Sequence, residues 1–224
     1  DNRLRSSIHI YYKNQSIVID TGPDFRQQMI NNNVSTLDAI LFTHEHKDHV
    51  AGLDDVRPFN FIQKKPIDGL VFSPGPGTVE KKADIGNSMN ILEHFLGKIP
   101  ILGICLGHQL LGKYFGASVK HVAPVHGKKW PIIITKEGEK SIFRGRTSPL
   151  EGMRYHSMVL DEETLPEALT VTAKTEDGLI MGIESLEHMA FGLQFHPESV
   201  GTMFGKKILQ NFLNVSLRQH KWSG

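Results

Sequence analysis

The sequence is poor in cysteine, in long apolar runs and in net charge, and each shortage excludes a class of protein. One cysteine among 224 residues excludes an internal disulfide framework. No window approaches the roughly 18 to 20 continuous apolar residues of a membrane helix. The 25 basic and 24 acidic side chains leave a formal net charge of +1, so no field of one sign draws the chain to nucleic acid or an acidic membrane.

The composition that remains is that of a folded chain. With 39% hydrophobic and 22% charged residues, the chain can bury the core of one large domain or of two small ones. Two tryptophans are too few for a surface on which nucleic-acid bases stack. The single thiol, together with the lack of a recognisable secretory signal, predicts a reducing, cytoplasmic location.

Apolar runs and helical periods alternate along the first half of the chain. Residues 7–12, 16–20 and 37–43 are predicted strands, and residues 24–32 are a predicted helix. From residue 70 the order is strand (70–73), Gly/Pro loop, helix (85–96), strand (99–104) and helix (107–115). This alternation is typical of βαβ units, so we expect an α/β fold with a mostly parallel central sheet and helices on both faces.

The second half is richer in strands. Residues 118–123, 131–135, 169–175, 179–184 and 190–194 are predicted strands, and an apolar helix is expected to end near Leu213. A polar patch and a proline at residues 63–66 mark a candidate boundary. The sequence therefore predicts a first segment of residues 1–66, a second of residues 67–215 and a solvated tail of residues 216–224.

Cys105 lies in the run Gly103-Ile104-Cys105-Leu106-Gly107, between a predicted strand and a predicted helix. This pattern matches the G-x-nucleophile-x-G elbow, in which a tight turn lifts the nucleophile above the sheet. The positive end of the helix dipole favours the thiolate, which is the nucleophilic form. A lone cysteine after an apolar strand is also what a buried small hydrophobic residue looks like, so the interpretation needs partner residues.

Two other motifs supply candidate partners. His196-Pro197-Glu198 follows a predicted strand, and its spacing lets Glu198 orient the imidazole of His196 toward Cys105. The loop Ser73-Pro74-Gly75-Pro76-Gly77 leaves another strand, where a rigid backbone N–H can point at a developing oxyanion.

These three motifs, in this order, resemble the class I (triad) glutamine amidotransferase family over about residues 68–213. The resemblance implies a flavodoxin-like fold and no cofactor. It implies that Cys105 attacks the side-chain amide of glutamine, that His196 acts as general base and then acid, and that Glu198 orients it. Further roles are implied by position: oxyanion-hole N–H groups at Gly75 and Leu106, a substrate contact at Gln109, and binding of the glutamine main chain at Ser157 and Met158.

Within that family, four segments are most similar to the small subunit of anthranilate or aminodeoxychorismate synthase. They are residues 73–78, 125–128, 154–157 and 196–199. Such a small subunit supplies ammonia to a large synthase subunit that binds chorismate. We therefore expect the chain to bind glutamine and a large synthase subunit of this kind, and to bind neither nucleic acid nor membrane.

The opening of the chain carries a different motif. Residues 43–49 contain three imidazoles and two carboxylates, a ligand set that suits Zn, Mn or Fe. Together with Ile19-Asp20-Thr21-Gly22, this motif makes residues 1–66 resemble the early part of metallo-β-lactamase-fold hydrolases. The resemblance implies that His44 and His46 hold one metal and that Asp48 and His49 hold the other.

The later metal ligands of that fold have no counterpart downstream, because His121, His126 and His156 lack the matching surroundings and are expected to be surface or structural residues. The chain thus looks composite, joined near residues 65–68. A natural fusion, an engineered recombinant and a wrongly assembled sequence all remain open. We expect the opening strand, helix and strand to complete the amidotransferase sheet, whose usual first elements are replaced. The alternatives to a glutaminase are a metal-dependent hydrolase and an inactive hybrid of the two folds.

Overall fold

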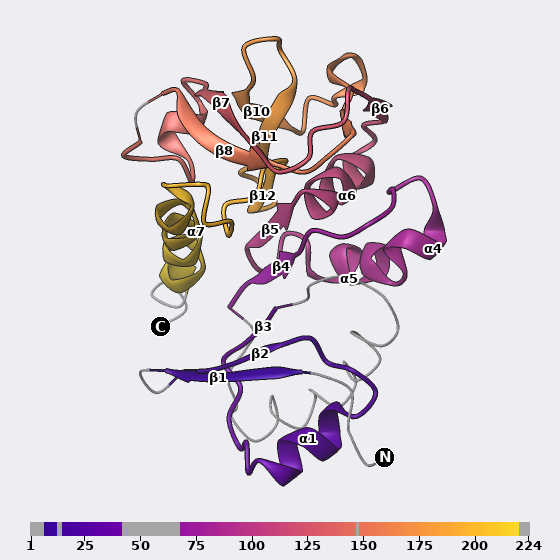
Figure 1. Cartoon of the computed structure of the whole chain (residues 1–224), viewed down its shortest axis with the longest axis vertical. Coiled ribbons are helices and arrows are strands. Elements are labelled where there is room, and N and C mark those ends of the chain that lie inside the picture. Colours follow the sequence, from indigo (N-terminus) through magenta and orange to yellow (C-terminus); the bar gives the residue numbers. More distant parts are fainter. Residues whose placement is uncertain (1–6, 13–14, 42–67, 147, 220–224) are drawn as a thin grey trace.

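The computed structural model describes residues 7–12, 15–41, 68–146 and 148–219. Its largest feature is a seven-stranded sheet in the order β4-β5-β12-β11-β10-β7-β8 (Figure 1). In that order the strands are β4 (Leu70–Phe72), β5 (Ile101–Ile104), β12 (Ala190–Leu193), β11 (Ile180–Ser185), β10 (Thr170–Lys174), β7 (Lys128–Ile134) and β8 (Leu150–Arg154).

The large sheet is mixed, so the prediction of a mostly parallel sheet is wrong. Strand β5 is parallel to β4 and to β12. The other neighbouring pairs, from β12 across to β8, are all antiparallel. A parallel neighbour needs a long crossover connection, usually a helix, and among the described residues no α-helix separates β7 from β12. Within the large sheet, the α/β arrangement is therefore confined to β4, β5 and β12.

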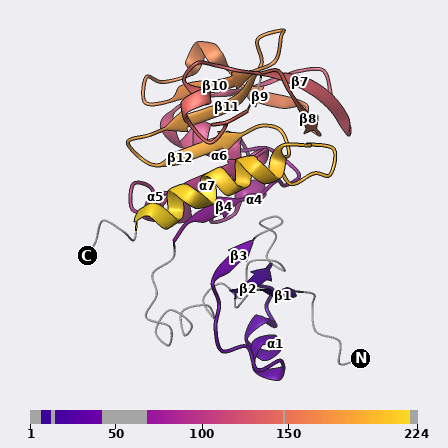
Figure 2. The same ribbon diagram turned by 90° about the vertical axis from the view of Figure 1, so that its left-hand side faces the viewer.

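Helices cover both faces of this parallel part. Helices α4 (Lys82–Ile85), α5 (Ser88–Phe95) and α6 (Leu106–Phe115) lie on one side, and α7 (Gly205–Gln219) lies on the other (Figures 1 and 2). Successive side chains of a strand point to opposite faces, so Ile101 packs with α5 and α6 whereas Leu102 packs with α7. The core on the α7 side includes Leu102, Ile104, Phe191, Leu193, Phe195, Ile208 and Phe212.

Two helices differ from their predicted bounds. The segment expected as one helix over residues 85–96 is two helices, because Gly86 adopts a φ of +50° and ends α4. The final helix continues past Leu213 to Gln219, since its apolar face extends through Ile208, Phe212 and Val215 against the sheet. Part of the expected solvated tail is thus helical.

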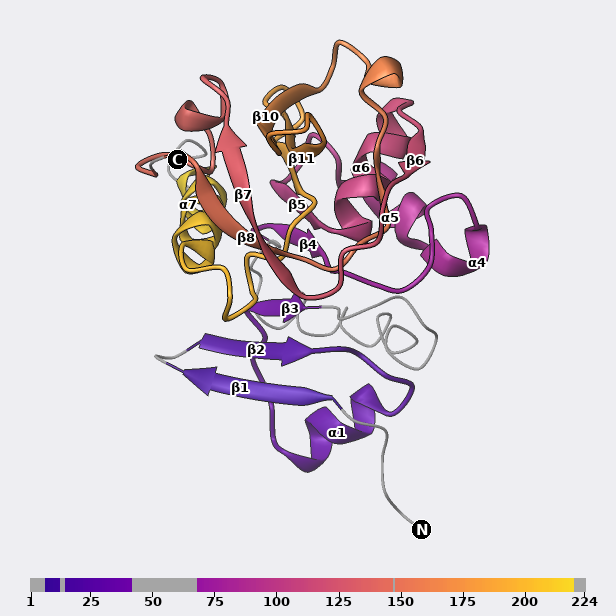
Figure 3. The same ribbon diagram turned by 45° about the horizontal axis from the view of Figure 1, so that its top comes forward.

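The opening segment forms a small sheet of its own. Strands β1 (Ile8–Tyr12) and β2 (Gln15–Ile19) are antiparallel, and β3 (Ala39–Leu41) pairs with β2 in parallel after α1 (Phe25–Asn31). In the described ranges none of the three pairs with the large sheet (Figure 3), so the prediction that they complete it is wrong. Strands β1 and β3 occupy both edges of β2. Phe25 and Met29 of α1 form a separate core with Val18 of β2.

Two strands were not predicted at all. One is β8, and the other is β9 (Met158–Leu160), which pairs antiparallel with β6 (Val119–His121) in a two-stranded ribbon that contacts α6. Among the described residues, no helix combines the length and the apolar character needed to cross a membrane.

Candidate active site

The order of the strands brings three distant motifs to one edge of the large sheet. Because β4, β5 and β12 are parallel neighbours, the segments that follow them leave the sheet side by side. Phe72 of β4 and Gly192 of β12 both pair with Gly103 of β5, so the three strands end at the same level. The Ser73–Gly77 loop, Cys105 and the segment containing His196 therefore converge.

Cys105 forms a tight turn between β5 and α6. Its φ of +54° and ψ of −103° are rare for a residue with a side chain, and such backbone conformations cost about 1–3 kcal/mol. Two backbone bonds hold the turn: the Cys105 N–H donates to Leu193 O at 2.7 Å, and the Gln109 N–H donates to Cys105 O at 3.1 Å. A Cβ on Gly103 would lie 2.3 Å from the carbonyl oxygen of Gly107, so the turn requires glycine there.

The Cys105 side chain is almost enclosed, with 8% of the residue exposed. The Nε2 atom of Gln194, which is fully buried, lies 3.7 Å from its sulfur. The Oε1 atom of Gln194 accepts a hydrogen bond of 3.0 Å from Gln109 Nε2, and Gln109 Nε2 donates a second one of 3.0 Å to Met158 O. A row of buried amides thus ends at the thiol.

His196 is fixed by both its ring and its backbone. Its Nδ1 atom lies 2.7 Å from Glu198 Oε1. Its backbone N–H donates to Met153 O at 2.9 Å, and its carbonyl oxygen accepts a bond of 2.7 Å from Thr202 Oγ1. The hydroxyl oxygen of Thr202 also accepts from the Met153 N–H at 3.0 Å, so one buried threonine ties the histidine segment to β8.

The charge on His196 is set by opposing influences. Burial lowers its pKa, but Cys105 and Glu198 more than offset this and raise the pKa to about 9. The Nε2 atom is buried and makes no hydrogen bond of standard geometry with the described residues, so Cys105 acts on it as a close polar neighbour. Such long catalytic contacts are common before a substrate binds. At neutral pH the His196 imidazole is therefore protonated, and the Cys105 sulfur is a polar neighbour of this positive charge.

The other residues expected in the site lie around this pair. Gly75 is half-buried in the loop after β4, and Leu106 is the buried first residue of α6. Ser157 and Met158 are half-buried at the start of β9, with the Ser157 carbonyl accepting from the Val122 N–H at 2.9 Å. The structure thus brings Gln109 and Met158 into direct contact.

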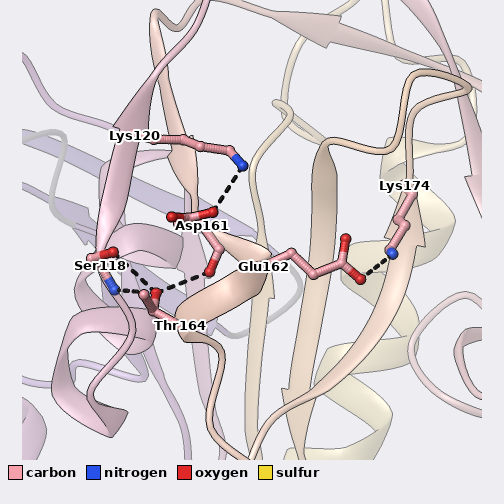
Figure 4. A network of polar contacts seen from close by, with 6 residues as sticks. All are labelled: Ser118, Lys120, Asp161, Glu162, Thr164 and Lys174. Atoms are coloured by element: carbon pink, nitrogen blue, oxygen red, sulfur yellow. Dashed lines mark hydrogen bonds and ion pairs between the residues drawn. The ribbon is translucent and has the colours of Figure 1, made fainter.

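A polar network holds the ribbon that carries Met158. Thr164 Oγ1 lies 2.9 Å from the Ser118 backbone nitrogen and donates to Asp161 O at 3.0 Å (Figure 4). Lys120 Nζ forms an ion pair of 2.8 Å with Asp161 across the ribbon. Exposed ion pairs stabilise little by themselves, but these bonds join β6 to the turn that follows β9.

Several buried polar residues near the site were given no catalytic or binding role from the sequence. Arg154 and His156 are both buried, and Arg154 Nε donates to His156 Nε2 at 3.0 Å. Burial, followed by the charge of Arg154, lowers the pKa of His156 to about 4, which agrees with the expected structural role of this histidine. His121 and His126 are exposed, as expected. Gln194 and Thr202 were also missed, although a glutamine at the end of an apolar strand was a usable signal.

The candidate metal ligands His44, His46, Asp48 and His49 lie outside the described residues. Within the described ranges, no group of three or more His, Cys, Asp or Glu side chains could hold a metal ion.

Comparisons with known proteins agree on one family. A family model described as glutamine amidotransferase class-I matches residues 14–215. The bifunctional protein TrpGD of Thermotoga maritima is 48% identical over 155 residues, which are 69% of this chain and 25% of that protein. Aminodeoxychorismate/anthranilate synthase component 2 of Bacillus subtilis is 43% identical over 155 residues, which are 69% of this chain and 77% of that protein.

A solved structure shares the fold. The crystal structure of a protein from Thermoplasma acidophilum, described as part of a GMP synthase, has a TM-score of 0.65 and 24% identity. The similarity covers 92% of this chain and 94% of that one. The family match begins at residue 14 and therefore takes in most of the opening segment; none of these matches supports a metallo-β-lactamase origin for it.

Proposed function

The chain belongs to the class I glutamine amidotransferase family, whose model matches residues 14–215, and from this premise we propose that Cys105, His196 and Glu198 hydrolyse glutamine for a chorismate-using synthase. The observation that carries the proposal is the convergence at the ends of β5 and β12. Leu193 accepts the backbone hydrogen bond of Cys105, and three residues later in the chain His196 contacts Glu198 at 2.7 Å.

In the first half of the reaction the Cys105 thiolate attacks the side-chain amide carbon of glutamine. A C–S bond forms, and the carbonyl electrons move onto oxygen, where the N–H groups of Gly75 and Leu106 receive the charge. His196 then donates its Nε2 proton to the amide nitrogen as the C–N bond breaks. Ammonia leaves, and a thioester of Cys105 remains.

The second half regenerates the enzyme. His196, now neutral, removes a proton from water while the water oxygen attacks the thioester carbon. The C–S bond breaks, and glutamate leaves with the thiolate and the imidazolium restored. Glu198 keeps the Nδ1 proton of His196 in place throughout, which directs Nε2 toward the reacting atoms.

The substrate is proposed to lie between α6 and β9. Ser157 and Met158 would hold the main-chain end of glutamine. Gln109 uses its amide nitrogen inside the protein, on Met158 and Gln194, so its Oε1 atom is the group available to a substrate donor.

The proposed partner is the large subunit of anthranilate synthase or of aminodeoxychorismate synthase, which binds chorismate. The support is that the similar Bacillus subtilis protein is named component 2 of these synthases, and that this chain spans 77% of it. We expect this protein to make anthranilate or aminodeoxychorismate formation glutamine-dependent when it is added to such a large subunit. Product formed only with ammonia, and never with glutamine, would refute this partner.

Ammonia release from glutamine tests the chemistry directly. The wild type should release ammonia, alone or with the large subunit, and Cys105→Ala should not. Gln210→Ala, on the exposed side of α7, is a surface control that should retain the wild-type rate. Equal ammonia release by wild type and Cys105→Ala would reject Cys105 as the nucleophile.

A metal-dependent hydrolase is not the function we propose. Its motivation was the motif with His44, His46, Asp48 and His49, and the amidotransferase family match takes in that segment. The hypothesis keeps a simple test, which is stoichiometric metal in dialysed protein together with a hydrolytic activity lost in His46→Ala.

A further inference from the structure

The row of buried amides beside Cys105 has a function that the triad does not cover. We propose that Gln194 is a catalytic residue that donates a hydrogen bond to the Cys105 thiolate, and that Gln109 fixes the direction of that bond. The inference extends the proposed glutaminase chemistry and rests on Cys105 being its nucleophile. Its first support is distance, because Gln194 Nε2 lies 3.7 Å from the Cys105 sulfur.

The direction of the Gln194 amide follows from a chain of hydrogen bonds. The carbonyl oxygen of Met158 can only accept, so the amide group of Gln109 must turn its Nε2 atom toward it. The same Nε2 atom lies 3.0 Å from Gln194, and a second donor must there meet an acceptor, Oε1. The remaining group of the Gln194 amide, Nε2, therefore faces the sulfur. The backbone carbonyl of Met158, acting through two amides, thus decides that the thiol meets a donor.

Burial makes this donor important. Gln194 is 0% exposed and Gln109 is 3% exposed, so water does not replace a lost bond at either amide. A sulfur that carries a negative charge in such an enclosed site needs donors, and a bond to an ion is stronger than a bond to a neutral thiol. Among the described residues, Gln194 makes the one side-chain hydrogen bond of standard geometry to this sulfur. Its hydrogen bond therefore adds to the effect of the His196 charge on this sulfur.

The Gln194 backbone is held independently of its side chain. Its N–H donates to Met181 O at 3.0 Å as β12 ends beside β11. Replacing the side chain by leucine removes the donor and leaves this strand contact, while Gln109 keeps its bond to Met158. The substitution thus separates stabilisation of the thiolate from the path of the chain.

The pH dependence of Cys105 alkylation measures the thiolate directly. The chain has one cysteine, so the mass added by iodoacetamide reports Cys105 alone. In Gln194→Leu we expect the pH midpoint of the alkylation rate to rise by about one unit, which is an about tenfold loss of thiolate at pH values below the midpoint. The matched control is Gln210→Leu, the same change on the exposed side of α7, which should keep the wild-type midpoint.

A second variant tests the orientation and leaves Gln194 in place. In Gln109→Glu the new side chain offers an acceptor oxygen to Gln194, so the Gln194 amide turns and presents Oε1 to the sulfur. We expect the alkylation midpoint to rise here as well. This variant also decides the question if Gln194→Leu does not fold, as judged by circular dichroism and thermal unfolding.

The outcomes separate this inference from the proposed function. Midpoints unchanged from wild type in folded Gln194→Leu or in Gln109→Glu would overturn the inference, even in a protein that hydrolyses glutamine. A raised midpoint in both variants supports the hydrogen bond from Gln194 to the Cys105 thiolate. If the wild type then releases no ammonia, the proposed function fails and the hydrogen bond stands without its catalytic role.

Discussion

A buried histidine one turn into α6 should make the protein sensitive to mild acid. His108 is 0% exposed, and neither ring nitrogen makes a hydrogen bond of standard geometry with the described residues. Burial lowers its pKa to about 3, an effect that the backbone of Gly192 partly opposes and the neighbouring His156 reinforces. The folded protein therefore keeps His108 neutral where an unfolded chain protonates it.

The magnitude of the effect follows from the difference between the His108 pKa in the folded protein and in the unfolded chain. Because the folded pKa is below the unfolded value of 6.5, the stabilising contribution is present above pH 6.5 and is lost as the pH falls toward 3. At about pH 5 the unfolded group is about 1.5 pH units below its pKa and the folded group is still neutral. The expected loss is about 2 kcal/mol, and it depends little on the folded pKa as long as that lies well below 5.

Substitution of His108 by leucine removes the titratable group without removing a hydrogen bond of standard geometry. The ring packs against the bare backbone of Gly192, where a Cβ would lie 2.7 Å from Nδ1, so a smaller apolar side chain fits the space. Urea unfolding at about pH 8 and about pH 5 should show that wild type loses about 2 kcal/mol more than His108→Leu. His156 and His196 are present in both the wild type and His108→Leu, so their pH-dependent contributions to the free energy of unfolding cancel in this comparison. Equal losses, within about 0.5 kcal/mol, would refute the reasoning.

The catalytic assignments and the turn geometry give further expectations. Glu198→Gln should lower kcat for glutamine more than it raises KM, because Glu198 orients His196 and is not placed on the substrate; an unchanged kcat would contradict this role. Glu198→Gln should also lower the pH at which activity falls on the alkaline side, since the Glu198 carboxylate helps raise the pKa of His196 to about 9. A pH–rate profile identical to that of the wild type would contradict this effect of Glu198. Thr202→Val should reduce kcat about tenfold, whereas Thr202→Ser, which keeps the hydroxyl, should have the wild-type kcat. A role in packing alone would not produce this difference between the two variants. Gly103→Ala should cost about 1–3 kcal/mol in urea unfolding, because its Cβ meets the backbone of α6.

Local features of the site could be predicted because they depend on neighbours in the chain. The turn at Cys105 needs a strand, a helix and two glycines, all of which are contiguous in the sequence. The contact between His196 and Glu198 spans two residues. The strands β4, β5 and β12 were located for the same reason, since each is a short apolar run followed by a break.

Strand pairing was the first feature that only the tertiary structure decided. The sheet is mixed because β7 to β12 follow one another without crossover helices, and the apolar pattern of a strand does not state which neighbour it takes. The opening segment shows the same limit: its strands were found, but they pair with each other around Val18 and Phe25, and none of them joins β4.

The electrostatics of the site also depend on tertiary contacts. Cys105 meets Gln194 across 89 positions of the chain, and Gln109 meets Met158 across 49. A local sequence pattern does not predict contacts between residues so far apart in the chain, and these contacts decide the orientation of each side-chain amide. The pKa values of His108 and His196 move in opposite directions although both residues are largely buried, because one has no charged partner to offset burial and the other faces a thiol and a carboxylate. The sequence by itself determined which nucleophile, base and carboxylate the chain contains. The pairing of β5 with β12 decided that Cys105 and His196 lie close enough to affect each other's charge.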